Sequence, residues 1–414
     1  MSVTDRFLKY VSYDTQSVED REEVPSTEKQ FELARVLRDE MLEMGLKDVF
    51  LDEKHCYVYG VIPSNISAEE LNKCRMPRGL GLIAHMDTAT EASGANVKPR
   101  IVKNYDGGDV ELSVSQKLSP SVYPSLLSYI GQDLIVTDGT TLLGADDKAG
   151  VAEIMALSER LMSEEGRSIK HGRIALCFTP DEEVGHGPSY FDMERMNCDF
   201  AYTVDGGRLG ELEYENFYAA ALDVRVKGVG IHPGSAKSIM KNASRIAEEF
   251  DFMLPAELKP EYTDGHDGFF HLENMKGAAN EAELRYLIRE FDRVKFDWMK
   301  RLVICACDYL NAKYGEGVIG FEIRDNYRNM LDKIRPHMHL VETAKEAFKA
   351  CGVEPIEQPI RGGTDGAELS WRGLPCPNLS TGGENFHSVS EYIPVQSMEK
   401  MVDVLTEIAR LSFI

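Results

Sequence analysis

The chain has 414 residues, of which 43% are hydrophobic and 28% are charged, and this length predicts two or three domains. Its 69 acidic and 46 basic residues give a net charge of −23, which argues against a nucleic-acid or anionic membrane partner, because both need clustered cations. No apolar run approaches the ~20 residues that span a bilayer. The first twenty residues also lack an apolar signal core. We therefore expect a cytoplasmic protein that binds neither nucleic acid nor membrane.

The eight cysteines are scattered and form no C-x-x-C pair. A disulfide framework and a zinc finger are both improbable on this spacing. We expect buried free thiols.

Helices are predicted between residues 3 and 45, where apolar residues recur at helical spacing. Four short apolar runs, each ending in a polar, glycine-rich segment, are predicted strands: 80–84, 174–178, 200–204 and 376–379. Further helices are predicted at 149–162 and 338–351. This alternation predicts an α/β fold with a mixed, largely parallel sheet flanked by helices.

A different pattern begins near residue 214. Residues 219–226 alternate as a half-buried strand does, and 228–234 read as a loop. Helices at 239–253 and 290–313 and a strand at 318–323 complete the segment. Strands and helices segregated in this way predict an inserted α+β domain. The expected boundaries are 1–213 and 327–414 for the larger domain and 214–326 for the insert.

Acidic residues and histidines gather where the predicted strands end. The set comprises His85, Asp87, Asp146, Asp147, Asp181, Glu182, Glu183, Asp205 and His387. Each alone has an ordinary explanation as a loop residue, and Asp146 and Asp147 could cap the helix that follows them. Together they predict one site, because ligands of open α/β sheets bind beyond the carboxyl ends of the strands. Two imidazoles with several carboxylates suit zinc, cobalt or manganese, and such acid-rich sets are typical of two-metal sites.

At these positions the sequence resembles a known family. The strings LIAHMDT, GADDKAGVAEI, FTPDEEVGHG, YTVDGG and GGENFHSVSEYIP are similar to those of the dinuclear-zinc exopeptidases and deacylases that carry a lid domain. FLKYVSYDTQS, DGHDGFFHL and PIRGGTDGAELSWRGLPCPNLSTGG extend the resemblance to the peptidase T branch, the tripeptide aminopeptidases, over essentially the whole chain.

The resemblance implies two Zn²⁺ per chain, with Co²⁺ or Mn²⁺ as substitutes. The implied metal ligands are His85, Asp146, Glu183, Asp205 and His387, with Asp146 bridging the two ions. It implies that Asp87 fixes the tautomer of His85 and that Glu182 is the general base. Neighbouring side chains of an extended segment point apart, so we do not expect Glu182 and Glu183 to bind one ion together.

The resemblance also implies that the insert is a lid, and that its His232 contacts the scissile carbonyl and stabilises the oxyanion. An exposed loop histidine is the simpler explanation of His232. Arg361 is a candidate for binding a substrate carboxylate, since arginine suits bidentate pairing. Arg289 is a weaker candidate, for which a surface ion pair is the simpler explanation. His266 and His271 are expected to be structural.

The sequence thus predicts a metallo-aminopeptidase that takes small peptides, tripeptides above all, as substrates. A dipeptidase or N-acyl amino-acid deacylase with the same site is the alternative. A non-catalytic metal-binding scaffold is less favoured, because such a protein has no need of Glu182. The fragment Gly228-x-Gly230 lacks the rest of a nucleotide-binding motif, and the metalloprotease pattern His-Glu-x-x-His is absent. The sequence leaves open the native metal, the side-chain preference, the residue that binds the substrate amine and the oligomeric state, including a homodimer. It also leaves open whether His232 serves its own subunit's site or a partner's.

Overall fold

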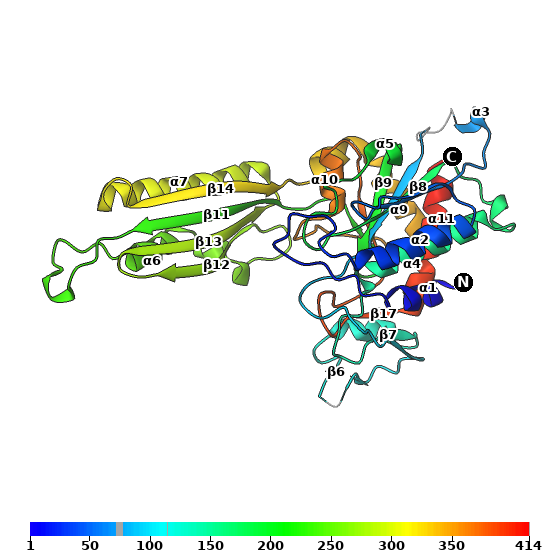
Figure 1. Ribbon diagram of the computed structural model, residues 1–414, viewed down its shortest axis with the longest axis horizontal. Helices are drawn as coiled ribbons and strands as arrows, with labels where there is room; N and C mark the ends of the chain where they lie inside the picture. Colours follow the sequence, from blue (N-terminus) through cyan, green and yellow to red (C-terminus); the bar gives the residue numbers. More distant parts are fainter. Residues whose placement is uncertain (72–77, 114, 414) are drawn as a thin grey trace. The chain divides into compact units, whose positions relative to one another are not determined.

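The computed structural model describes residues 1–71, 78–113 and 115–413, and this part of the chain divides into two compact units (Figure 1). Unit 1 comprises residues 1–214, 332–358 and 364–414. Unit 2 comprises residues 215–331 together with the short return segment 359–363. The sequence had not indicated that return segment, which carries Arg361.

The centre of unit 1 is an eight-stranded mixed sheet. Its strand order is β1 (Lys47–Leu51), β2 (Val58–Ile62), β8 (Ile174–Thr179), β3 (Leu80–His85), β9 (Phe200–Gly206), β16 (Asn378–Ser380), β10 (Glu211–Glu213) and β15 (Ile356–Glu357). The four central strands β8, β3, β9 and β16 are mutually parallel. Every residue of β3 and β8 is buried, which is why these strands read as continuous apolar runs.

Helices cover both faces of this sheet. On one side α4 (Ala145–Met162) packs on β3 and β9, and α11 (Val395–Leu411) and α1 (Val3–Tyr10) pack on α4. On the other side, residues of α5 (Met193–Met196) and α10 (Asp365–Trp371) join β-strand residues in a second apolar cluster. The remaining helices with residues in unit 1 are α2 (Gln30–Glu43), α3 (Ala68–Leu71), α8 (Leu331–Ile334) and α9 (His339–Ala350). A small sheet of β17 (Tyr392–Pro394), β7 (Leu134–Val136) and β4 (Arg100–Val102) and a hairpin of β5 (Val110–Glu111) and β6 (Lys117–Leu118) complete the unit.

Unit 2 is a four-stranded antiparallel sheet with two helices on one face. The strand order is β12 (Phe269–Gly277), β13 (Glu281–Glu290), β11 (Tyr218–Lys227) and β14 (Ile319–Tyr327). Helices α6 (Ala243–Met253) and α7 (Arg293–Tyr314) pack on the sheet and on each other. Residues of β13 alternate between buried and exposed, as expected of a sheet with one covered face.

The predicted fold class is confirmed, with local differences at element ends. The helix expected at 239–253 begins at Ala243, because Asn242 caps it. The helix expected at 290–313 begins at Arg293 after the capping residue Asp292, since Glu290 still belongs to β13. Strands β12 and β13 were not predicted. β12 is largely exposed beyond its first two residues, so it shows no apolar run.

The seven cysteines in the described part of the chain are free thiols, and five of them are buried; Cys74 lies outside the described residues. None of the helices described has the length and apolar character that crossing a bilayer requires.

Candidate metal centre

Asp146 and Asp147 begin helix α4, but their backbone angles are not helical and the peptide bond between them is cis. Asp147 acts as the cap: its carboxylate accepts hydrogen bonds from the backbone N–H of Gly150 at 3.2 Å and of His85 at 3.0 Å. A Cβ on Gly150 would lie 1.9 Å from the carbonyl oxygen of Val204, so only glycine lets α4 approach β9 this closely. The capping explanation therefore applies to Asp147 and leaves Asp146 free for the site.

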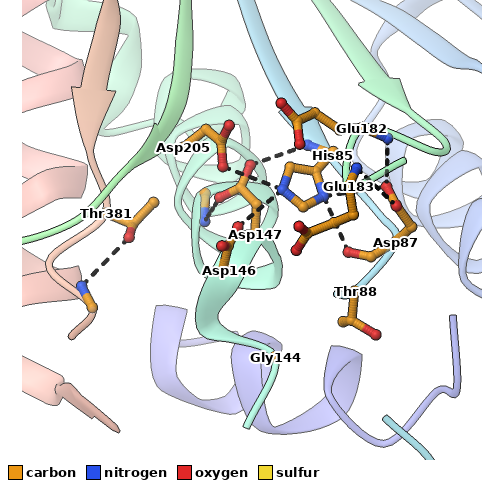
Figure 2. Close-up of polar contacts among 12 residues, drawn as sticks. His85, Asp87, Thr88, Gly144, Asp146, Asp147, Glu182, Glu183, Asp205 and Thr381 are labelled. Carbon is orange, nitrogen blue, oxygen red and sulfur yellow. Dashed lines mark hydrogen bonds and ion pairs between the residues drawn. The ribbon is translucent and has the colours of Figure 1, made fainter. Parts of the chain in front are cut away.

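The carboxylate of Asp146 lies between two imidazoles that are far apart in sequence. Its Oδ1 is 3.0 Å from Nε2 of His85, and its Oδ2 is 3.2 Å from Nε2 of His387. Figure 2 shows Asp146 and Asp205 beside the ring of His85. An acid with one oxygen toward each imidazole is arranged as a ligand that bridges two ions would be.

Two further acids complete the cluster. Asp205, near the end of β9, places Oδ1 3.2 Å from Nε2 of His85. Glu183 places Oε2 3.0 Å from Nε2 of His387, and its other oxygen is buried without a hydrogen-bond partner among the described residues. The structure thus brings together all five residues predicted to bind metal, and it places each of the five next to at least one other.

The donor set fits divalent cations. His85, Asp146 and Glu183 offer ligand atoms within 4.8 Å of one another, and so do His85, Asp147 and Asp205. Imidazole nitrogens and carboxylate oxygens are ligands for zinc and its neighbours, and the unpartnered oxygen of Glu183 is available to a cation. The cluster can therefore hold metal.

The electrostatics of the cluster point the same way. Burial raises the pKa of Asp205 to about 6 and that of Glu183 to about 8, and the charge of Asp146 adds to both shifts. Hydrogen bonds to Asp146 and Glu183 raise the pKa of His387 to about 12. The raised pKa values mean that the metal-free cluster binds protons, which reduce the repulsion among its crowded carboxylates. A divalent cation would displace these protons.

Asp87 lies behind the ring of His85. The Nδ1 atom of His85 is 3.0 Å from the carbonyl oxygen of Asp87 and 3.3 Å from its Oδ1. The same carboxylate accepts hydrogen bonds from the backbone N–H groups of Glu182 and Glu183 (Figure 2). This geometry suits the role expected for Asp87, which is to orient the imidazole.

Glu182 lies in a turn, and here the sequence argument was wrong. We had assumed an extended segment in which Glu182 and Glu183 point apart, but residues 182–185 form a turn closed by a 2.7 Å hydrogen bond from Gly185 N–H to the Glu182 carbonyl. Burial, with the charges of Asp205 and Asp365 added, raises the pKa of Glu182 well above its ordinary value. A buried carboxyl group with a raised pKa is suited to carry a proton.

The sequence analysis missed several buried carboxylates that support the centre. Glu391 accepts hydrogen bonds from the backbone N–H groups of Leu143, Gly144 and Asp146 at 2.7, 2.8 and 3.0 Å. Asp365 accepts from the hydroxyl of Thr179 at 3.0 Å, and burial raises its pKa to about 7. Both lie in strings already noted, GGENFHSVSEYIP and PIRGGTDG, but nothing local distinguishes them from surface acids.

Asp181 belongs to the set predicted from the strand ends, but the sequence assigned it no role. It accepts hydrogen bonds from the backbone N–H and the hydroxyl of Ser26 and from the side-chain amide of Gln30. These contacts fix the residue that directly precedes Glu182 to the N-terminal part of the chain.

The remaining predicted residues belong to unit 2, and their roles toward a substrate stay predictions. His232 is exposed in its loop, and its Nδ1 accepts a hydrogen bond from Gly234 N–H at 3.1 Å. Arg361 donates to the backbone carbonyls of Gly265 and Asp267 at 2.6 and 3.2 Å. Arg289 donates to the carbonyl of Arg361 at 2.9 Å.

The Nε atom of Arg289 is buried without a hydrogen-bond partner among the residues that the structure describes. His266 pairs with Glu215 at 2.9 Å, as suits a structural residue, and His271 is exposed.

Comparison with known proteins identifies the family. A family model described as peptidase family M20/M25/M40 matches residues 138–411. Peptidase T of Alkaliphilus oremlandii is 50% identical over 412 residues, 99% of each chain, and peptidase T of Halothermothrix orenii is 51% identical over 411 residues, 99% of this chain and 98% of the relative. The crystal structure of a tripeptidase from Staphylococcus aureus shares the fold, with a TM-score of 0.77 at 21% identity over 99% of this chain and 98% of that one. These matches confirm the resemblance inferred from the motifs and show that the chain belongs to the M20/M25/M40 peptidase family, in its peptidase T branch.

Proposed function

We propose that the chain is a metal-dependent aminopeptidase that removes the N-terminal residue from tripeptides, with zinc as the native metal. The observation that carries this proposal is that His85 and His387 both contact Asp146, while Asp205 lies against His85 and Glu183 against His387. Glu182 directly precedes Glu183 in the chain. Membership of the peptidase T branch supports the substrate class.

The proposed chemistry assigns distinct work to the residues of the cluster. His85 and Asp205 would hold one ion, His387 and Glu183 the other, and Asp146 both. A pair of such ions lowers the pKa of a bound water and polarises the scissile carbonyl. Glu182 takes the proton from the attacking water and delivers it to the leaving amine, acting first as base and then as acid. Asp87 keeps the ring of His85 in the required tautomer.

Unit 2 is proposed to act as a lid. His232 would donate a hydrogen bond to the oxyanion, and Arg361 or Arg289 would bind the carboxylate of the tripeptide. A substrate held at its amine end by the metal centre and at its carboxylate end by an arginine has a defined length. This defined length is our explanation for a preference for tripeptides over shorter and longer peptides.

Two further statements complete the proposal. We place the protein in the cytoplasm, which the free thiols of its described cysteines support.

We also propose a homodimer. It is supported by β14, which lies at the edge of the unit 2 sheet and exposes Phe321. Sedimentation of the wild type and of Phe321→Lys tests the homodimer.

A substrate panel tests the function. The metal-free chain, restored with Zn²⁺, Co²⁺ or Mn²⁺, is offered Ala-Ala-Ala, Ala-Ala, Ala pentapeptide, N-acetyl-Ala-Ala-Ala and the blocked amino acid N-acetylalanine, and the released products are identified. We expect kcat/KM to be highest for Ala-Ala-Ala, with free alanine as the first product and no cleavage of the acetylated peptide. Faster cleavage of Ala-Ala would favour a dipeptidase, and release of acetate from blocked amino acids would favour a deacylase. Two bound metals with no hydrolysis of any substrate would favour a scaffold.

A further inference from the structure

A carboxylate that none of the predicted roles includes contacts His387. Oε1 of Glu91 lies 3.0 Å from Nδ1 of His387, while Nε2 of the same ring faces Asp146 and Glu183. Glu91 is an exposed residue six positions after His85, in the loop that follows β3. One nitrogen of the His387 ring is therefore directed to the metal cluster and the other to Glu91.

The other imidazole of the cluster is held in the same way. His85 turns Nε2 toward Asp146 and Asp205, and its Nδ1 lies beside Asp87. Each ring thus has a carboxylate beside Nδ1 and leaves Nε2 for the cluster, although Nδ1 of His85 lies closer to the Asp87 carbonyl oxygen, at 3.0 Å, than to its carboxylate, at 3.3 Å. Both of these carboxylates come from one loop, residues 86–92.

The backbone of this loop is fixed on both sides of Glu91. The side-chain amide of Gln16 donates hydrogen bonds to the carbonyl of Ala89 at 2.9 Å and to the carbonyl of Ala92 at 2.7 Å. The hydroxyl of Thr15 donates to the carbonyl of Met86 at 2.7 Å. Glu91 is exposed at its side chain but is carried by backbone that Gln16 holds in place.

We propose that Glu91 is a positioning residue that orients His387 for metal binding, and that Gln16 supports it by holding the loop. This inference rests on the proposed function, because it needs a metal at His387. The physical reason is that a carboxylate accepting the Nδ1–H of an imidazole fixes the tautomer whose Nε2 lone pair is free, and it makes that nitrogen a better ligand. Loss of such a partner typically lowers metal affinity ~10–100-fold.

Titration of the metal-free full-length chain with Co²⁺, followed by calorimetry and by the visible spectrum, tests this role. We expect two sites in the wild type. Glu91→Ala should weaken one site by about 10–100-fold and leave the other unchanged. Glu91→Gln, whose amide oxygen still accepts the Nδ1–H, should restore most of the affinity. The control is Glu399→Ala, which removes an exposed glutamate from α11 and should change neither site.

Two further measurements separate positioning from folding. Because Glu91 is exposed, the thermal midpoint of the metal-free Glu91→Ala chain should equal that of the wild type. Gln16→Met should weaken the same site as Glu91→Ala, and the double variant should lose no more affinity than the stronger single variant. Full affinity at both sites in Glu91→Ala would overturn this inference and leave the proposed function intact. A wild type that binds no Co²⁺ or Zn²⁺ would overturn both.

Discussion

The backbone N–H of Glu182 donates a hydrogen bond to Oδ1 of Asp87 at 3.0 Å, although the two residues are 95 positions apart in the chain. The same carboxylate accepts from Glu183 N–H at 3.2 Å and lies beside Nδ1 of His85. Asp87 therefore joins an imidazole of the metal cluster to the turn that carries the proposed base.

Replacing Asp87 tests this junction. Asp87→Asn keeps the shape of the side chain but replaces one of the two acceptor oxygens with an amide nitrogen. That nitrogen cannot accept a hydrogen bond, so only one of the two backbone N–H groups keeps its partner. We expect metal affinity to fall about 10–100-fold and kcat to fall with it, as measured by calorimetry and by steady-state kinetics at saturating metal. The control is Asp192→Asn, at the half-buried N-cap of α5, whose side chain accepts a hydrogen bond from Arg195 N–H. Unchanged metal binding in Asp87→Asn would contradict the orienting role.

Glu182→Gln separates chemistry from metal binding. The amide keeps the size of the side chain but cannot take a proton, so kcat should fall by at least ~10²–10⁴-fold while both metals stay bound. Metal analysis of the dialysed variant beside the wild type provides the check. Loss of a metal equivalent would show that Glu182 is a ligand and that its role as general base was wrong.

Removal and return of metal should depend on pH. Five ligands, with Asp146 between the two imidazoles, imply close to two equivalents of metal per chain, and a chelator should abolish activity. Burial raises the pKa of Glu183 to about 8 and that of Asp205 to about 6, so both groups hold protons that a cation must displace. Affinity should therefore be higher at pH 8 than at pH 6, and binding at pH 7 should release protons. Calorimetry in buffers of different ionisation enthalpy measures the release, and equal affinity at the two pH values would contradict the prediction.

Glu213 should make the protein less stable as the pH rises. Burial raises its pKa to about 8, against a smaller opposing effect of the 2.7 Å hydrogen bond from Asn378. A carboxyl group whose pKa is raised on folding favours the folded state at low pH, and this contribution is lost between about pH 4.5 and 8. Glu213→Gln should thus raise the free energy of unfolding at pH 8 by about 1 kcal/mol or more, and much less at pH 5. Denaturant unfolding of the metal-free chains at both pH values, with Glu399→Gln as the control, measures the difference.

The two arginines of unit 2 should differ in their effect on substrate binding. Nη1 of Arg361 donates hydrogen bonds to two backbone carbonyls. In contrast, the buried Nε of Arg289 has no hydrogen-bond partner among the described residues. Arg289→Lys should therefore raise KM for Ala-Ala-Ala by about tenfold, the equivalent of ~1.4 kcal/mol, and have little effect on the tripeptide amide. Arg361→Lys tests the original assignment under the same conditions. If only Arg361→Lys discriminates acid from amide, Arg361 is the carboxylate site, and equal losses on both substrates would remove an arginine from that role.

The site residues that could be predicted from the sequence are those marked by a local pattern, an apolar strand that ends in an acid or a histidine. His85 and Asp205 lie at the ends of β3 and β9, and the acids 181–183 follow β8. The apolar runs of these strands are plain in the sequence. The supports of these residues could not be predicted in the same way. Ser26 reaches Asp181 across 155 positions, and Glu391 reaches the backbone of Asp146 across 245. Such contacts depend on how distant segments pack, and an acid or serine that makes one has no sequence signal different from that of a surface residue. The segment at Glu182 and Glu183 was wrongly expected to be extended, because the hydrogen bond from Gly185 N–H to the Glu182 carbonyl that closes the turn is not apparent in the sequence.

The order of strands in unit 1 has a consequence for the synthesis of the protein. β16 inserts between β9 and β10, and His387 follows it close to the C-terminal end, whereas Ser26 and Gln30 come from the N-terminal part of the chain. The centre therefore combines segments that leave the ribosome at widely separated times. A nascent chain that has not been synthesised beyond β9 lacks β16 and His387, so the complete metal centre can form only after these residues have been made.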